Sequence, residues 1–120
     1  MNEDDKFDLR ARTKAFALRV IRLYVALPKT TEAQVIGKQV LRSGTSVGAH
    51  YREAKRARST SEFVSKIEGG LQEFEETVYW LELLTESGII PNNRLTDLLH
   101  EAEELTAILV SSVKTAKNKR

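Results

Sequence analysis

The chain has 120 residues, the length of one ordinary domain, and its 41% of hydrophobic and 30% of charged residues are typical of a globular protein. The absence of cysteine excludes disulfides and thiolate metal sites, and no apolar run approaches the roughly 20 residues that a membrane-spanning helix requires. The net charge is only +2 and residues 1–5 are acidic, unlike a secretion signal, so we expect a single cytoplasmic domain over residues 1–120 with no membrane contact.

The first predicted helix covers about residues 5–26. Apolar side chains recur there at steps of three and four residues, the spacing of one helix face. The helix ends before Pro28, because the residue that precedes a proline is disfavoured in the helical conformation. The predicted core positions are Leu9, Thr13, Phe16, Val20, Leu23 and Leu27.

The second predicted helix covers about residues 32–58, with Thr31 as its N-cap. Its middle, residues 43–49, has low intrinsic helix propensity. Small residues such as Gly44 allow another backbone to approach closely, and this packing would keep the segment helical; a kink is the alternative. The predicted core positions are Ala33, Ile36, Val40, Gly44 or Ser43, Val47, Tyr51 and Ala54.

The third predicted helix covers about residues 60–86. Ser59 and Glu62 have the spacing of a reciprocal capping box at its start, and Ser87-Gly88 is typical of a helix end. The predicted core positions are Phe63, Ile67, Leu71, Phe74, Val78, Leu81 and Leu84.

The fourth predicted helix covers about residues 94–116, after a turn over Pro91-Asn92-Asn93. Its predicted core positions are Leu95, Leu98, Ala102, Leu105, Leu109 and Val113. Four amphipathic helices with short connections pack as antiparallel neighbours. The predicted fold class is therefore all-α, an antiparallel up-and-down four-helix bundle.

The sequence contains no recognisable set of catalytic or metal-binding residues. Asp97-x-x-His100 is only half of a di-iron motif, and no second motif accompanies it. The serines lack the strand–turn–helix elbow that exposes a nucleophile, and Gly69-Gly70 is not part of a phosphate loop. We therefore expect a protein that is not an enzyme and that uses no cofactor.

Basic side chains gather where the second and third predicted helices meet. Residues 38–67 carry seven basic and two acidic side chains, whereas residues 68–104 carry one basic and ten acidic ones. Arg52 and Arg56 lie one turn apart beside Tyr51, an arrangement that can contact phosphates and stack a base. The alternative is a solvated helix end whose cations complement the helix dipole. The candidate nucleic-acid-binding residues are Arg42, Arg52, Lys55, Arg56, Arg58 and Lys66.

A family resemblance rests on three segments: residues 39–54 (QVLRSGTSVGAHYREA), residues 62–67 (EFVSKI) and residues 76–84 (ETVYWLELL). Together they resemble the bacterial four-helix-bundle proteins encoded within intervening sequences of 23S ribosomal RNA genes. The resemblance extends from Phe16 into the fourth predicted helix. His50 departs from it, because this family usually carries asparagine at that position.

The resemblance implies a ring-shaped homopentamer. It also implies kinship with accessory proteins of diversity-generating retroelements, which bind nucleic acid and a reverse transcriptase through basic surfaces. In a ring, ion pairs between subunits would use several of the matching polar residues, in competition with a nucleic-acid role. The matching polar residues are Arg42, Arg52, Glu53, Arg58, Glu62, Lys66, Glu73 and Glu76. We therefore predict an oligomer that binds RNA or DNA through basic patches, and the alternative is a structural or adaptor oligomer that contacts only proteins.

Overall fold

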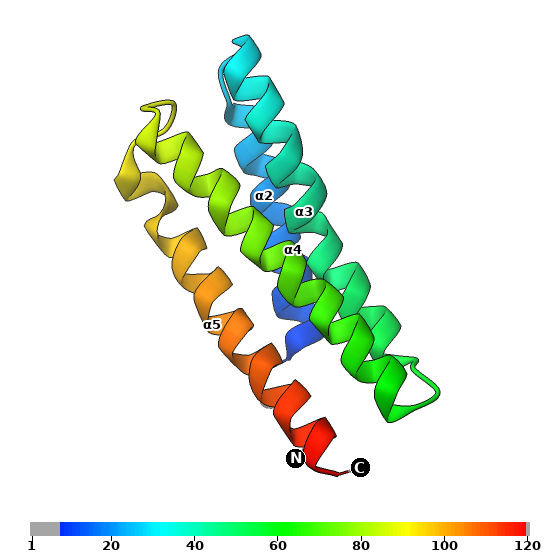
Figure 1. Ribbon diagram of the computed structural model, residues 1–120. Helices are drawn as coiled ribbons and strands as arrows, with labels where there is room; N and C mark the ends of the chain where they lie inside the picture. Colours follow the sequence, from blue (N-terminus) through cyan, green and yellow to red (C-terminus); the bar gives the residue numbers. More distant parts are fainter. Residues whose placement is uncertain (1–7, 120) are drawn as a thin grey trace.

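The computed structural model describes residues 8–119, which form four α-helices: α2 (Leu9–Ala26), α3 (Thr31–Lys55), α4 (Thr60–Glu86) and α5 (Asn92–Asn118). Successive helices run in opposite directions (Figure 1). The start of α2, the α3–α4 connection and the end of α5 therefore share one end of the bundle. The predicted all-α antiparallel four-helix fold is confirmed.

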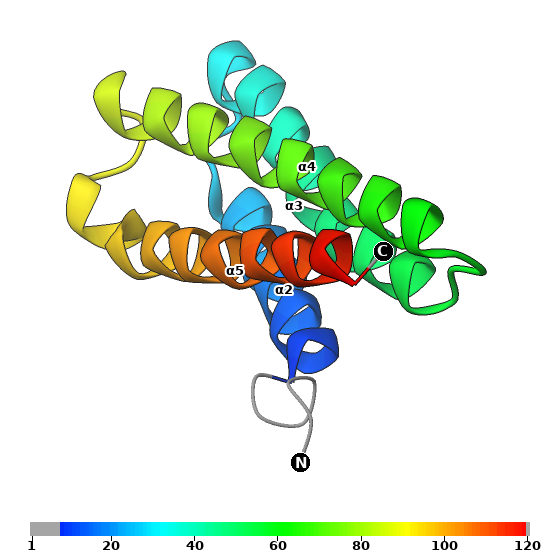
Figure 2. The same cartoon turned by 60° about the horizontal axis from the view of Figure 1, so that its bottom comes forward.

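The helices do not contact one another equally. α3 packs most extensively on α4 and also packs on α2, whereas the contact between α2 and α5 is the least extensive (Figure 2). One ion-pair cluster bridges that sparse side, because Arg12 of α2 donates to Glu101 at 2.7 Å and to Glu104 at 3.1 Å on α5. These two carboxylates, Glu101 above all, raise the pKa of the Arg12 guanidinium.

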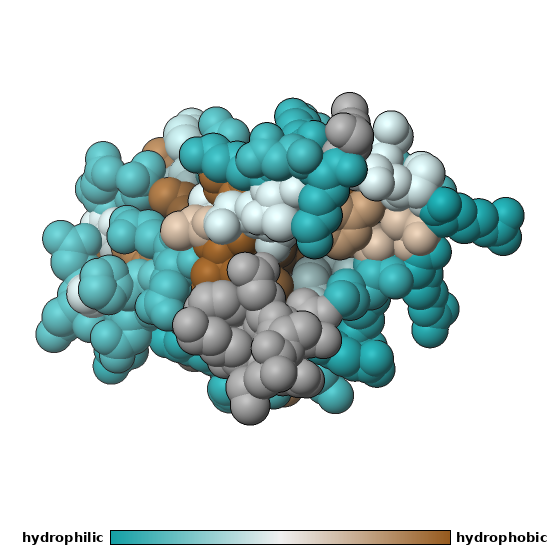
Figure 3. Space-filling view, turned by 90° about the horizontal axis from the view of Figure 1, so that it is seen from below, coloured by the Kyte–Doolittle hydropathy of each residue, from teal (hydrophilic) through white to brown (hydrophobic). Residues whose placement is uncertain are grey.

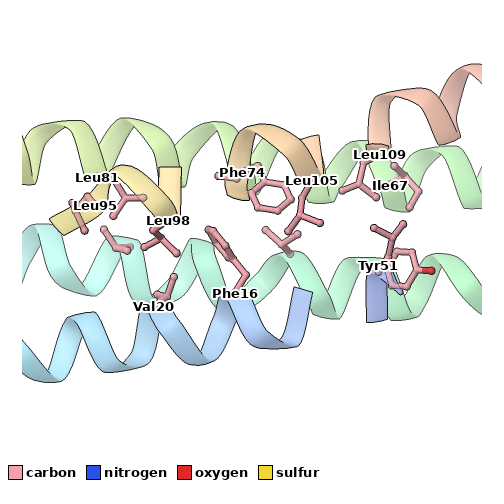
Figure 4. Close-up of a cluster of buried hydrophobic side chains, with 14 of the residues drawn as sticks. Phe16, Val20, Tyr51, Ile67, Phe74, Leu81, Leu95, Leu98, Leu105 and Leu109 are labelled. Carbon is pink, nitrogen blue, oxygen red and sulfur yellow. The ribbon is translucent and has the colours of Figure 1, made fainter. Parts of the chain in front are cut away.

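The core runs along the bundle axis and takes side chains from all four helices (Figure 4). At its centre the rings of Phe16 and Phe74 meet edge to face, with centroids 5.3 Å apart. Most predicted core positions are buried. The exceptions are partly buried side chains at the margin of the core: Leu23, Ile36, Phe63, Leu71 and Val78.

The middle of α3 belongs to one uninterrupted helix, which runs without a sharp bend in Figure 1. A Cβ atom on Gly44 would lie 2.8 Å from Cγ2 of Val20, and one on Gly48 would lie 3.2 Å from Oγ1 of Thr13. Both glycines therefore face α2 of the same chain. Tertiary packing compensates here for the poor helix propensity of the segment.

The N-terminal ends of three helices differ from the prediction. α2 begins at Leu9, capped by Asp8, while the predicted start at residues 5–7 lies outside the described residues. Thr30, not Thr31, caps α3, because its hydroxyl accepts a hydrogen bond from the Ala33 N–H. α5 begins at Asn92 directly after Pro91, so the predicted turn over Asn92 and Asn93 was wrong. The fixed φ of proline, here −62°, is compatible with a helix start.

The helix ends also differ in two places. α3 ends at Lys55 and not at Arg58, because the N–H groups of Arg56 and Ala57 make short-range bonds to the carbonyls three residues earlier. Ser59 then turns to an extended conformation and caps α4, as predicted. Gly88 (φ 80°) follows the end of α4, and α5 extends to Asn118, two residues beyond the prediction.

Candidate nucleic-acid interface

The end of the bundle that holds the α3–α4 connection concentrates basic side chains. Residues 50–68 and 111–119, which meet at this end, carry eight basic and three acidic side chains. Viewed from this side, the surface is mostly hydrophilic around a smaller apolar area (Figure 3). We call it the basic end.

A groove of about 740 Å³ lies at the basic end, between the α3–α4 connection and the last turns of α5. Lys55 and Arg58 line it from α3 and the connection, and Lys119 lines it from the end of α5. Phe63, from the first turns of α4, forms part of its lining, together with hydroxyl-bearing residues such as Thr115. We call this the end groove.

A smaller hollow, about 300 Å³, lies between the start of α2 and the end of α3. Arg10, Arg52, Lys55 and Arg56 line it, and Asp8 contributes one carboxylate. We call it the side groove. Because Lys55 lines both grooves, the two adjoin and form one cationic surface.

Three arginines of this surface pair with no carboxylate among the described residues. Within residues 8–119, the guanidinium groups of Arg52, Arg56 and Arg58 have no ion-pair partner, and all three side chains are exposed. An exposed cation with no internal partner is available to an external anion. This surface therefore brings together four predicted residues, the three arginines and Lys55.

The other two predicted residues are used inside the bundle. Arg42 donates to Glu76 at 2.8 Å and to Glu73 at 3.3 Å, which ties α3 to α4. Lys66 of α4 lies 2.8 Å from the carboxylate of Glu53 on α3. The hydrogen bond between them lowers the pKa of Glu53 and raises that of Lys66. These three ion pairs form within one chain and join α3 to α4, and ion pairs between subunits stay a prediction.

His50 is the position at which the sequence departs from the family that it resembles. Its ring packs on Gly69, where a Cβ atom would lie 2.9 Å from the imidazole. Nδ1 is buried and has no hydrogen-bond partner among residues 8–119, and Nε2 lies 3.9 Å from Glu73. The histidine therefore acts mainly as a packing residue between α3 and α4.

Three residues that line the two grooves were not among the predicted nucleic-acid-binding residues. Lys119 belongs to the basic C-terminal block, but it was expected beyond the last helix. Arg10 is far from α3 in the sequence, and Phe63 was expected only in the core. The composition of residues 105–120, four basic side chains and no acidic one, was the available signal for Lys119.

Other kinds of site are not evident in the part of the chain that the structure describes. Within residues 8–119, no three histidine, aspartate or glutamate side chains converge to hold a metal ion. Over the same residues, none of the helices combines the length and apolar composition needed to cross a membrane.

Two comparisons with known proteins find relatives. The family described as 23S rRNA-intervening sequence protein matches residues 5–111. A crystal structure of a protein of unknown function from the S23 ribosomal protein family of Bacteroides thetaiotaomicron is 37% identical and superposes with a TM-score of 0.83. That match covers 88% of this chain and 97% of the other. None of the curated proteins matches the chain.

Proposed function

The chain belongs to the 23S rRNA-intervening sequence protein family, and we propose that it is a non-enzymatic, oligomeric helical-bundle protein that binds RNA or DNA at its basic end. One observation carries the proposal: Arg52, Arg56 and Arg58 gather there without a carboxylate partner among residues 8–119. Because nucleic acids of a bacterial cell lie in its cytoplasm, we also propose a cytoplasmic location.

The electrostatics favour a polyanion over a single small anion. Cations from α2, α3 and the end of α5 line two adjoining grooves, so they present several positive charges along a path. A nucleic-acid backbone presents phosphates at regular intervals, and each neutralised phosphate releases condensed counterions. Binding of this kind is strong at low salt and depends little on sequence.

A salt titration of a double variant tests the proposal. Replacing Arg52→Gln together with Arg56→Gln removes two charges from the side groove without touching the core. For duplex DNA, each lost phosphate contact should reduce the slope of log affinity against log salt by about 0.9. We therefore expect weaker binding and a slope that is flatter by about 1 to 2.

The matched control removes the same charge at the opposite end. Arg22 and Arg94 are exposed and lie near the α4–α5 connection, so Arg22→Gln with Arg94→Gln should leave affinity and salt slope unchanged. Equal effects of the two double variants would mean that only net charge matters. No measurable affinity of the wild-type protein for RNA or DNA at low salt would refute the proposal.

A separate observation supports the structural or adaptor alternative, in which the protein acts through self-association. Leu18, Ile21 and Val25 recur at three- and four-residue steps on α2 and are 44%, 41% and 68% exposed. Such an apolar stripe on a helix favours a protein partner. A hollow on α4 offers a complement, because Glu75 and Glu76 flank Tyr79 and Trp80 there while basic residues flank the α2 stripe.

We propose that the α2 stripe contacts a second copy of the chain, in line with the pentamer that the family resemblance implies. Light scattering should then give several times the monomer mass of 13.6 kDa. Leu18→Ser with Val25→Ser should lower that mass, whereas Val110→Ser, on α5 and 37% exposed, should not. A wild-type monomer at micromolar concentration would refute self-association and leave the nucleic-acid proposal untouched.

A further inference from the structure

The end groove has the features of a site for an unpaired nucleic-acid strand. Its cations come from both sides, with Arg58 on the α3–α4 connection and Lys119 at the end of α5. A groove of about 740 Å³ falls within the range of roughly 300–1,000 Å³ that encloses a ligand the size of a small molecule. It is thus large enough to take part of a strand inside, where basic groups lie on two sides.

Phe63 decides which form of nucleic acid fits. The side chain is half-buried, packs at the margin of the core and lines the same groove as the cations. An aromatic ring in such a place stacks on a base, and stacking needs a base that has left its own helix. In a duplex the bases face each other inside the stack, so the ring would have no base to contact.

The polar groups of the lining suit the sugar–phosphate backbone. The Ser59 hydroxyl accepts from the Glu62 N–H and keeps its own proton to donate to a ligand, whereas the Ser112 hydroxyl already donates to the Ile108 carbonyl. Thr60 and Thr115 add further hydroxyls to the same lining. Hydroxyl groups of this kind bind phosphate and sugar oxygens without reading sequence.

We infer that the end groove binds a single-stranded segment of RNA or DNA, with phosphates on its cations and a base stacked on Phe63. The strand continues past Lys55 into the side groove, because that lysine lines both. The inference rests on the proposed function and specifies its ligand as an unpaired strand. It also gives the two grooves different roles, since Phe63 in the end groove is half-buried, whereas Tyr51, the aromatic residue that lines the side groove, is only 5% exposed.

The test compares a fluorescently labelled 12-nucleotide single strand with the blunt-ended duplex that the same strand forms with its complement, in which every base is paired. Binding is followed by anisotropy at several salt concentrations, with wild type, Phe63→Leu and Phe63→Tyr. We expect wild type to bind the single strand more tightly than the duplex. Phe63→Leu should lose about fivefold or more of the single-strand affinity while duplex binding is unchanged, and Phe63→Tyr, which keeps a ring, should retain it.

A second variant covers the case in which Phe63→Leu does not fold, as judged by circular dichroism. Arg58→Gln with Lys119→Gln changes only exposed side chains and should reduce the salt slope for the single strand by about 0.7 per lost contact. The same charge change at Arg22 and Arg94, at the other end of the bundle, should have no effect.

The outcomes separate the inference from the proposed function. If single strand and duplex bind equally and Phe63→Leu changes neither, while the Arg52 and Arg56 double variant weakens both, the single-strand inference is overturned and the proposed function stands. If neither nucleic acid binds, both are overturned. If polyglutamate of equal charge displaces the strand at equal concentration, the groove does not bind nucleic acid more tightly than an acidic protein segment. The inference is then also overturned.

Discussion

Gly44 and Gly70 offer opposite outcomes for the same substitution to alanine. A methyl group on Gly44 would lie 2.8 Å and 3.1 Å from the two Cγ atoms of Val20, which is fully buried. A methyl group on Gly70 would meet only Cβ of His50 at 3.5 Å and the Val47 carbonyl at 3.8 Å, both ordinary contacts. The first substitution therefore overpacks the α2–α3 interface and the second does not.

The expected magnitudes follow from two opposing terms. Alanine is more favourable than glycine inside a helix by about 1 kcal/mol. Overpacking of a core costs about 1–3 kcal/mol, and the branched side chain of Val20 has no open space to turn into. We therefore expect Gly44→Ala to destabilise by about 1 kcal/mol and Gly70→Ala to stabilise by about 1 kcal/mol.

Urea unfolding followed by circular dichroism, at one fixed protein concentration, measures both values. A double-mutant cycle adds a control: Val20→Ala removes the two Cγ atoms, so Gly44→Ala should cost less in that background. Stability of Gly44→Ala equal to or above that of Gly70→Ala would refute the packing argument. Additive effects in the cycle would show that Val20 is not the cause.

Three further outcomes are expected. Leu81→Ala, at a fully buried position of α4, should cost about 2–5 kcal/mol in urea unfolding, and a cost below about half a kcal/mol would mean that the core is misassigned. Arg12→Gln should cost about 1 kcal/mol by the same assay, since the part-buried pair with Glu101 is lost on the side where helix contacts are sparsest; Arg22→Gln, on the same helix, should be neutral. The pair of Glu53 with Lys66 should stabilise the fold at neutral pH. Its contribution should fade as pH falls through the lowered pKa of Glu53, and at the alkaline end as pH rises through the raised pKa of Lys66, so the stability difference between wild type and Glu53→Gln should shrink in both directions.

The helix caps show how far local chemistry can be predicted. The N-cap role of Ser59 was predicted correctly, because its hydroxyl accepts from the Glu62 N–H. The reciprocal half of the capping box differs, because the Glu62 carboxylate accepts from the Arg58 N–H at 3.5 Å and not from the N–H of Ser59. At Thr30 and Thr31 two adjacent hydroxyls fit the same role, and only the course of the chain after Pro28 selects the first. The end of α3 was predicted three residues late, since nothing in the local sequence of residues 56–58 forbids a helix.

The candidate site also has residues that the local sequence predicted correctly and residues that it did not. The sequence identified Arg52, Arg56 and Arg58 as a cluster because they are close in the chain, and the structure places them on one end surface. The sequence also predicted Arg42 as a binding residue, although that side chain pairs with two glutamates more than thirty residues away. Charge counted along a chain does not reveal which charges neutralise one another across helices.

The sequence alone determined the number of helices, the residues that face the core and the helical class. Apolar side chains recur with the 3.6-residue period of a helix, and the places where this period is interrupted mark the helix ends. The sequence also determined that the charge is divided into basic and acidic blocks. The tertiary structure alone decided that Gly44 and Gly48 face α2, that Arg10 and Lys119 join the arginines of α3, and that Phe63 lines a groove between cations. The physical reason is that these relations depend on the rotation and offset of one helix against another, which are set by the packing of many side chains at once and by no single segment.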